Sequence, residues 1–292
     1  KGEIKTPSGL LQGQKIDLIF KRQAVPVADI RDFDHLSIPF RAVACDISTG
    51  EAVVIGSGDL AMAMRASMSV PAAFAPVEID SRLLVDGGVS NNLPVDVVRE
   101  MGADLVIAVD ISTPLLERSA LASALKITEQ LSGFLTRRNT ERQIASLTDQ
   151  DVLIEPDLGN IASGSFDKAA EAIPKGTSAA NKKRQELARF SLSEKMYAAS
   201  LEGRLQPGRE EPVIEFIRLD NKSQLSDEVL LARLNVEEGQ PLHLTELEDD
   251  IAKIYGLELF ENISYEIVRE DGQTGLVIHA RERSWGPNYL QF

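Results

Sequence analysis

The sequence predicts a layered α/β domain followed by a small α+β module. Three observations predict this order. Up to about residue 190, short apolar runs alternate with segments of helical periodicity, as in α/β domains. A charged stretch containing Pro207 and Gly208 then marks a boundary. Beyond it the pattern is strand, helix, helix, strand, strand.

Local signals place the elements of the first domain. The turn Ser48-Thr49-Gly50 joins two strands into a hairpin, Asp59 is placed to cap a helix, and Pro94 and Gly102 bracket another. The continuous apolar run 105–111 is typical of a buried parallel strand. The expected strands are 40–47, 51–55, 83–85, 105–111 and 151–156, and the expected helices are 60–69, 94–101, an amphipathic 114–148, and 166–190 with an interruption near Pro174.

In the second part, Thr245 and Glu248 have the spacing of a capping box that begins a helix. Asp271-Gly272 is a strong hairpin signal. Phe260, Ile263, Tyr265 and Ile267 alternate approximately, as expected of a half-buried strand. The expected strands are 213–219, 260–269 and 276–283, and the expected helices are 226–234 and 244–255.

The run Asp86-Gly87-Gly88 is the principal candidate for chemistry. Asp86 follows the apolar strand 83–85 and has no bulky neighbour on its C-terminal side. A carboxylate so placed suits a general base acting on a hydroxyl. The alternative is a plain turn, in which the two glycines supply positive φ angles.

A wider set of motifs surrounds this run. Residues 65–74 read R-A-S-x-S-x-P-x-x-F, the D-G-G run follows at Asp86, and N-x-P follows at Asn92. Over about residues 10–190 this pattern closely resembles the patatin-like phospholipases. The resemblance implies a phospholipid or other lipid ester as substrate. It also implies a catalytic dyad in which Asp86 takes the proton of a serine nucleophile.

A nucleophilic serine of the usual G-x-S-x-G form does not occur in the sequence. Ser178, in Gly176-Thr177-Ser178-Ala179-Ala180, comes nearest, but a helix is expected before it where the motif needs a strand. We therefore expect no nucleophile in this chain. The serine would lie in an N-terminal segment of a longer protein, and this chain alone would be inactive.

The remaining reactive side chains do not suggest a metal or cofactor. Cys45 is the only cysteine, and there are no Cys/His clusters of the zinc-binding kind. Asp46 and Asp110 stand at strand ends, as turn or cap residues do. No histidine adjoins Asp86, which favours a Ser-Asp dyad over a triad, and a neutral surface role is expected for His35, His243 and His279.

The formal net charge of −14 makes nucleic acid an unsuitable partner and gives no attraction to anionic lipid. Contact with membrane lipid would therefore depend on apolar insertion. No apolar run reaches the roughly 18 residues of a spanning helix.

The second module resembles the POTRA modules that precede outer-membrane barrels. The expected organisation is a patatin-like region at 1–192, a linker at 193–210, the POTRA-like module at 211–284, and the start of a barrel strand at 285–292, marked by Trp285, Tyr289 and Phe292. This order is similar to that of bacterial type V secreted patatins. It implies a barrel in the same precursor, a secreted or cell-surface patatin-like part and a periplasmic POTRA-like part.

Two functions remain open from the sequence. The first is a lipid acyl hydrolase, a phospholipase A or esterase, that uses Asp86 and a serine from outside this chain. The second is a non-catalytic outer-membrane secretion or assembly protein with a degenerate patatin-like domain. The upstream gene sequence distinguishes them, because only the first requires a strand followed by G-x-S-x-G.

Overall fold

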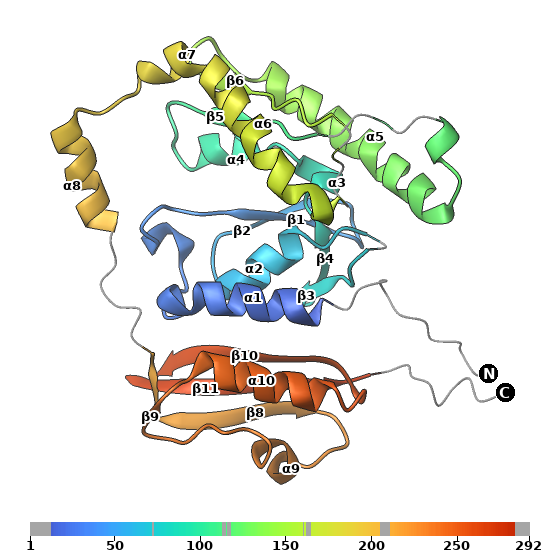
Figure 1. Cartoon of the computed structure of the whole chain (residues 1–292), viewed down its shortest axis with the longest axis vertical. Helices are drawn as coiled ribbons and strands as arrows, with labels where there is room; N and C mark the ends of the chain where they lie inside the picture. Colours follow the sequence, from blue (N-terminus) through green and yellow to red (C-terminus); the bar gives the residue numbers. More distant parts are fainter. Residues whose placement is uncertain are drawn as a thin grey trace. The chain divides into compact units, whose positions relative to one another are not determined.

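The computed structural model describes residues 13–71, 73–112, 115, 118–159, 161, 165–204 and 211–283 (Figure 1). The chain divides into two compact units. Unit 1 holds the described residues of 1–42, 55–83 and 206–292, and unit 2 holds those of 43–54 and 84–205. The expected boundaries at 192, 210 and 284 stay predictions. The aromatic residues of 285–292 lie outside the described residues.

The C-terminal part of unit 1 is a three-stranded sheet of order β10-β11-β8. β10 (Phe260–Glu270) and β11 (Gln273–Glu282) are antiparallel, and β11 runs parallel to β8 (Phe216–Lys222). Asp271 and Gly272 both have positive φ, 51° and 85°, as the predicted two-residue hairpin turn requires. The helices of this module are α9 (Asp227–Leu231) and α10 (Leu244–Tyr255), and two short strands, β7 (Val213–Ile214) and β9 (Gln240–Pro241), pair antiparallel.

A bulge in β10 explains its imperfect alternation. The pairing register with β11 shifts between Phe260 and Asn262, so the inward positions move from even to odd numbers. Phe260, Ile263, Tyr265 and Ile267 are all buried and belong to one apolar core with residues of α10 and β11.

Helix α1 (Gln14–Ala24) is part of this same core. Leu18 of α1 is buried among the apolar residues of β10, β11 and α10. The Gln14 amide group donates to the carbonyl of Ile263 at 2.5 Å, and its oxygen accepts from the N–H of Ile263 at 3.1 Å. Asn262 in turn donates to Asp17 at 2.9 Å. The N-terminal helix thus completes a module that lies some 250 residues away in the sequence.

The predicted capping box at the start of α10 is wrong. The helix begins at Leu244, with His243 as an N-cap that makes no side-chain bond, so Thr245 already lies in the first turn. Glu248 instead accepts hydrogen bonds from Arg22 of α1, at 3.1 Å to Nε, and from the hydroxyl of Tyr265, at 3.2 Å. Glu248 therefore forms a tertiary ion pair with Arg22 and does not cap the helix.

Arg65 organises the other half of unit 1. It lies on α2 (Leu60–Ser67), whose N-cap Asp59 accepts from the N–H of Met62 at 3.0 Å, as predicted. The buried guanidinium donates to Asp17 at 2.7 Å and to Ser69 at 2.5 Å. It also stacks on the ring of Phe74 at 5.1 Å. Of the motif residues, Arg65, Ser69 and Phe74 therefore form one buried cluster.

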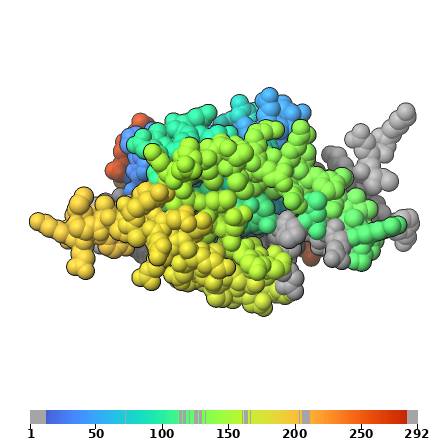
Figure 2. Space-filling model, turned by 90° about the horizontal axis from the view of Figure 1, so that it is seen from above, coloured from blue at the N-terminus to red at the C-terminus, as the bar shows by residue number. Residues whose placement is uncertain are grey.

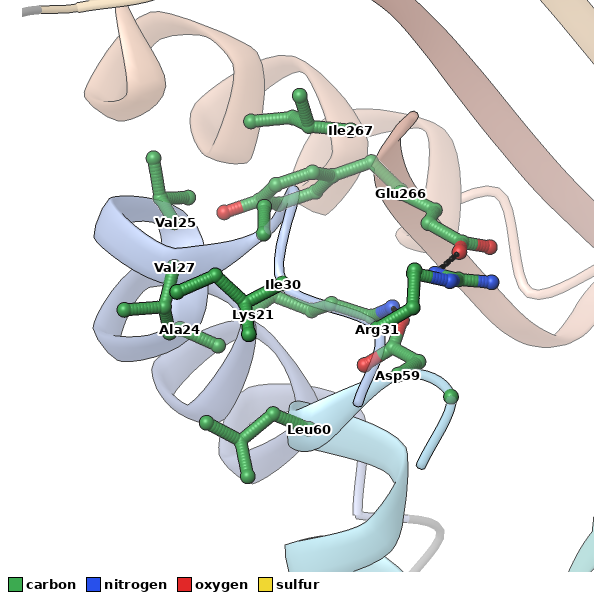
Figure 3. Close-up of a pocket in the computed structure, with 13 residues that line it drawn as sticks. Lys21, Ala24, Val25, Val27, Ile30, Arg31, Asp59, Leu60, Glu266 and Ile267 are labelled. Carbon is green, nitrogen blue, oxygen red and sulfur yellow. Dashed lines mark hydrogen bonds and ion pairs between the residues drawn. The ribbon is translucent and has the colours of Figure 1, made fainter. Parts of the chain in front are cut away.

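Unit 1 also contains the pocket drawn in Figure 3. Its wall combines apolar residues from α1 and the following turn, such as Ala24 and Val27, with charged pairs. Lys21 pairs with Asp59, and Arg31 with Glu266 at 2.5 Å. Because these charges already neutralise one another, the pocket presents no unpaired charge to a ligand. None of the predicted site residues lines it.

Unit 2 is built around strands that end at polar turns. β1 (Ala42–Asp46) pairs antiparallel with β4 (Arg82–Asp86), and the strand order in the sheet is β2-β1-β4-β3. The expected hairpin partner of β1 is β2 (Ala52–Ile55), and β3 spans Val77–Ile79. β5 (Ile107–Val109) and β6 (Val152–Ile154) form a separate parallel pair, as expected for 105–111.

The run 105–111 is less buried than expected. Ala108 points into a small core with Leu93, Val95 and Val106. Ile107, Val109 and Ile111 are exposed. One face of this short strand is therefore left uncovered, and β6 is its only strand neighbour among the described residues.

Asp151 connects the elements of unit 2. Its carboxylate is buried and accepts from Arg99 at 2.6 Å, from the N–H of Val106 at 2.8 Å, and from the N–H and hydroxyl of Thr148 at 2.8 and 2.9 Å. Burial raises its pKa, but these donors outweigh burial and lower the pKa to about 2. Arg99 lies on α4 (Val95–Glu100), so the cluster joins α4 to the N-terminal ends of the parallel strands β5 and β6.

The expected interruption at Pro174 is wrong. α6 (Ala169–Lys182) continues through Pro174 and ends before Lys183, where α7 (Arg184–Ala188) begins. Pro174 is the sixth residue of α6 and lacks the N–H that would bond the carbonyl four residues earlier, so the helix continues with one fewer hydrogen bond. The other described helices of unit 2 are α3 (Gly88–Asn91), α5 (Ala124–Ala145) and α8 (Glu194–Arg204). Unit 2 also has the 3₁₀ turns η3 (Arg118–Ala120) and η4 (Phe166–Lys168). The 3₁₀ turns of unit 1 are η1 (Val25–Val27) and η2 (Phe33–His35).

Candidate functional site

Asp86 is the last residue of β4, opposite Ala44 of β1. The strand ends in α3, so the carboxylate lies at a strand-to-helix junction and is half-buried. Its Oδ1 accepts from the N–H of Gly88 at 2.7 Å. No other hydrogen bond or ion pair to Asp86 is found among the residues that the structure describes, so the carboxylate has capacity for a further donor.

Burial raises the pKa of Asp86 above its ordinary value, and the Gly88 N–H partly opposes this effect. A carboxylate whose pKa is raised is a stronger base than an exposed one. The site therefore holds a carboxylate with the properties that proton abstraction from a hydroxyl requires.

The two glycines do not supply positive φ, so the plain-turn alternative is wrong in its mechanism. Gly87 has a φ of −66°, and Gly88 begins α3. Gly87 is required for close approach instead, since a Cβ at this position would lie 2.1 Å from the carbonyl oxygen of Val43 on β1. A Cβ at Gly88 would lie 2.8 Å from side-chain atoms of Asn92 and Asp86.

Helix α5 holds the D-G-G run from the other side. The carbonyl of Gly88 accepts from Thr136 Oγ1 at 2.8 Å and from Asn139 Nδ2 at 3.2 Å. Asn139 Oδ1 also accepts from the N–H of Asn92 at 3.0 Å. These bonds hold the carbonyl of Gly88, the residue whose N–H orients Asp86. Sequence reasoning missed Thr136 and Asn139, because nothing local distinguishes them from other polar residues of a long helix.

Further polar groups extend the site along Asn92. Its Nδ2 lies 3.3 Å from Ser112 Oγ and 3.4 Å from Thr140 Oγ1. The neighbouring Asn91 is buried, and its Nδ2 donates to Asp96 at 2.9 Å, but its Oδ1 has no hydrogen-bond partner among the residues that the structure describes. A buried acceptor without a donor is uncommon in native structures.

The other sequence candidates lie elsewhere. Ser178 is in the interior of α6, and the expected helix before it is confirmed. Asp46 and Asp110 accept from the N–H groups of Ser48 and Ser112, at 2.8 and 2.9 Å, in the turns predicted for them. Among the described residues no cluster of three His, Cys, Asp or Glu side chains suited to a metal ion is found.

The histidines lie in unit 1, and two of them have the expected surface position. His35 and His243 are largely exposed. His279 is not a neutral surface residue: Nδ1 lies 3.1 Å from Asp220 and Nε2 3.5 Å from Glu266, and the hydrogen bond with Glu266 raises the pKa of the imidazole. The contacts of His279 on β11 with Asp220 and Glu266 link this strand to β8 and β10.

The glycine requirement gives a direct test. Gly87→Ala is expected to destabilise the protein by roughly 3 kcal/mol, because the methyl group would overlap a backbone oxygen that cannot rotate away. Gly88→Ala should be milder, since its neighbours are side-chain atoms. Gly176→Ala, in open space on α6, is the control and should change stability by less than about 1 kcal/mol. Urea unfolding measures all three, and equal effects at 87 and 176 would contradict the packing argument.

Comparison with known proteins supports the reading of this region. Residues 20–99 match the patatin-like phospholipase family model. The patatin-like region therefore includes Asp86 and both glycines. An uncharacterized NTE family protein of Mycobacterium tuberculosis is 39% identical over 105 residues, which is 36% of this chain and 28% of that protein. Patatin-like phospholipase domain-containing protein 7 of Mus musculus is 41% identical over 85 residues, 28% of this chain and 6% of that protein.

This chain thus spans little more than a quarter of the mycobacterial relative's length. Among solved structures, POTRA1-3 of the periplasmic domain of Omp85 from Anabaena matches at 10% identity with a TM-score of 0.22, over 76% of this chain and 78% of that one. A score this low does not establish a shared fold. No described helix is both long enough and apolar enough to cross a bilayer.

Proposed function

We propose that this chain is part of a lipid acyl hydrolase, a phospholipase A or esterase, in which Asp86 is the general base. The observation that carries the proposal is the geometry of Asp86 within the patatin-like region. The carboxylate is half-buried at a strand end, is oriented by the Gly88 N–H, and makes no other bond to a described residue.

In the proposed reaction a serine from outside the printed sequence is the nucleophile. Its hydroxyl proton passes to Asp86 as Oγ attacks the carbonyl carbon of a lipid ester. The tetrahedral intermediate then expels the alcohol, which leaves with the proton held by Asp86. Water, deprotonated by Asp86 in the same way, releases the fatty acid and restores the serine. A dyad of this kind needs no histidine, and none lies in unit 2.

The first test is activity with and without the upstream segment. The 292-residue chain should not hydrolyse p-nitrophenyl esters or phospholipids, because the printed sequence contains no G-x-S-x-G. Extension with the upstream coding sequence should restore hydrolysis. Inhibitor-sensitive hydrolysis by the 292 residues alone, lost on Ser178→Ala, would contradict the proposal.

We further propose that the C-terminal part is a POTRA-like module in the periplasm, linked to an outer-membrane barrel in a bacterial type V precursor, with the patatin-like part secreted or at the cell surface. Export of the patatin-like part would then require α1 to leave the core that it shares with this module. The supporting observation is the strand, helix, helix, strand, strand order around the β10-β11-β8 sheet. Surface proteolysis of intact cells tests it. Degradation of the C-terminal module before outer-membrane permeabilisation would oppose the placement.

The second function, a non-catalytic assembly protein, would share this C-terminal module. It differs in predicting that no upstream elbow exists, so that the extended protein also lacks hydrolase activity.

A further inference from the structure

Helix α5 packs against the D-G-G run through polar contacts. Thr136 and Asn139 bind the Gly88 carbonyl, and Gln143 Oε1 accepts from the N–H of Asp96, while Ile144 near the end of the helix packs against the small core around Val95. The expected amphipathic helix over 114–148 is wrong: α5 is shorter, and its apolar residues are not gathered on a buried face. This arrangement is unusual, because burial of apolar side chains normally drives helix packing.

The outward face carries an apolar stripe formed by Ile127, Leu131, Phe134 and Leu135. These residues have the spacing i, i+4, i+7 and i+8 that places side chains on one side of a helix. Each is between 48% and 57% exposed. In Figure 2, α5 lies on the side of unit 2 that faces the viewer, in green to lime. Single exposed apolar residues are ordinary, but a contiguous group of four marks an interaction surface.

Arginines continue the same stripe toward the end of the helix. Arg138 and Arg142 lie eleven and fifteen residues after Ile127, which is close to three and four helical turns. Both are exposed, and neither forms an ion pair with a residue that the structure describes. Arg137, in contrast, pairs with Glu141 at 2.9 Å. α5 has four basic and two acidic residues in a chain whose net charge is −14.

We propose that this face of α5 is the surface by which the protein docks on a phospholipid bilayer. An interfacial helix combines an apolar face that enters the headgroup boundary with basic residues that meet lipid phosphates. The stripe has both parts. Covering it with an apolar protein surface would instead bury two arginines without partners. Because the opposite face of α5 binds Gly88, docking would bring the bilayer to the helix that holds the D-G-G run. The choice of lipid as the occupant rests on the proposed function.

The test measures partition of the 292-residue chain onto sedimented vesicles of ether-linked phosphatidylcholine, with and without phosphatidylglycerol. Ether lipids cannot be hydrolysed, so the result does not depend on catalysis. The double variant Leu131→Gln/Phe134→Gln should lower partition about tenfold or more on both vesicles. Arg138→Gln should lower it mainly on vesicles with phosphatidylglycerol.

Ile173→Gln is the matched control, since Ile173 is an exposed apolar residue of α6 outside the stripe. It should partition as the parent does, and thermal melting checks that every variant is folded. Absence of parent binding, or equal partition of the double variant and parent, would overturn the proposal. The proposal would also fail if the parent self-associated and the double variant was monomeric but bound vesicles as well as the parent does. The stripe would then be a contact surface for a second copy of the chain. The two proposals can fail separately. If Asp86→Asn in the extended protein still hydrolysed lipid, but the α5 variants lowered vesicle binding as expected, the proposed function would fail and the docking surface would stand.

Discussion

Asp86→Asn in the protein extended by its upstream segment is expected to lower kcat by about 100-fold or more, the scale of general base catalysis. Asn preserves the size of the side chain, and its Oδ1 can still accept from the Gly88 N–H, so the fold should remain. It cannot take up the serine proton. Steady-state hydrolysis of a soluble ester, with melting temperature as the check on folding, measures the effect.

Asp46→Asn is the matched control. Asp46 also ends a strand and accepts from the N–H two residues later, at 2.8 Å, but on β1 it pairs with Leu84 and not with Asp86, which faces Ala44. Its replacement should leave kcat within about twofold, on the reasoning that only the general base contributes the catalytic factor. Equal rates for parent and Asp86→Asn would leave Asp86 as a turn residue.

The pH profile has a definite direction. Asp86 must be ionised to act as base, and burial raises its pKa above the ordinary value. Activity should therefore be complete at neutral pH and fall as pH decreases through this raised pKa, at a higher pH than an exposed aspartate would give.

Asp151→Asn is expected to destabilise unit 2 by about 3–5 kcal/mol, the usual consequence of removing one partner from a buried ion pair. The change leaves Arg99 without its partner and weakens two backbone donors and one hydroxyl donor. A loss of this size is a large fraction of the stability of an ordinary domain. Urea unfolding followed by circular dichroism measures it, and Asp157→Asn, at an exposed loop position of the same unit, is the control.

Acid should remove the same contribution. The pKa of Asp151 is lowered to about 2 in the folded protein, so the folded state holds the ionised form more strongly than the unfolded chain does. The stabilisation is therefore present above the ordinary aspartate pKa near 4 and is lost as pH falls through about 2. In Asp151→Asn this part of the acid dependence should be absent. An unchanged acid profile in the variant would contradict the assignment.

The sequence predicted those parts of the fold that short-range chemistry determines. Asp59 caps α2, Asp271-Gly272 makes the hairpin, and Gly102 ends α4 with a φ of 89°, each within a few residues of its signal. The position of Asp86 at a strand end was equally readable. Contacts between distant residues, such as Gln14 with Ile263, could not be predicted, because no local sequence pattern indicates which distant residue will be the partner.

The same limit explains the errors. Glu248 has the spacing of a capping residue, but Arg22 from the other end of the chain offers a charged partner. The apolar run of β5 predicts burial, but the exposure of Ile107 and Val109 depends on which elements pack on that face of the strand. For the candidate site, the strand-end position of Asp86 was predictable from its motif, whereas Thr136 and Asn139 act through a helix that begins more than thirty residues later.

The double hydrogen bond between the Gln14 amide and Ile263 has a consequence for protein production. A side-chain amide presents the same donor and acceptor as a neighbouring strand, so Gln14 blocks the outer edge of β10 at this point against pairing with another molecule. The opposite edge of the sheet, β8, has no strand beside it among the described residues. A truncated version that begins after α1 would therefore expose a second, ready-made edge together with the apolar surface around Leu18. Filament formation or domain-swapped multimers would be the foreseeable outcome, and expression of the C-terminal module is best designed with residues 13–24 included.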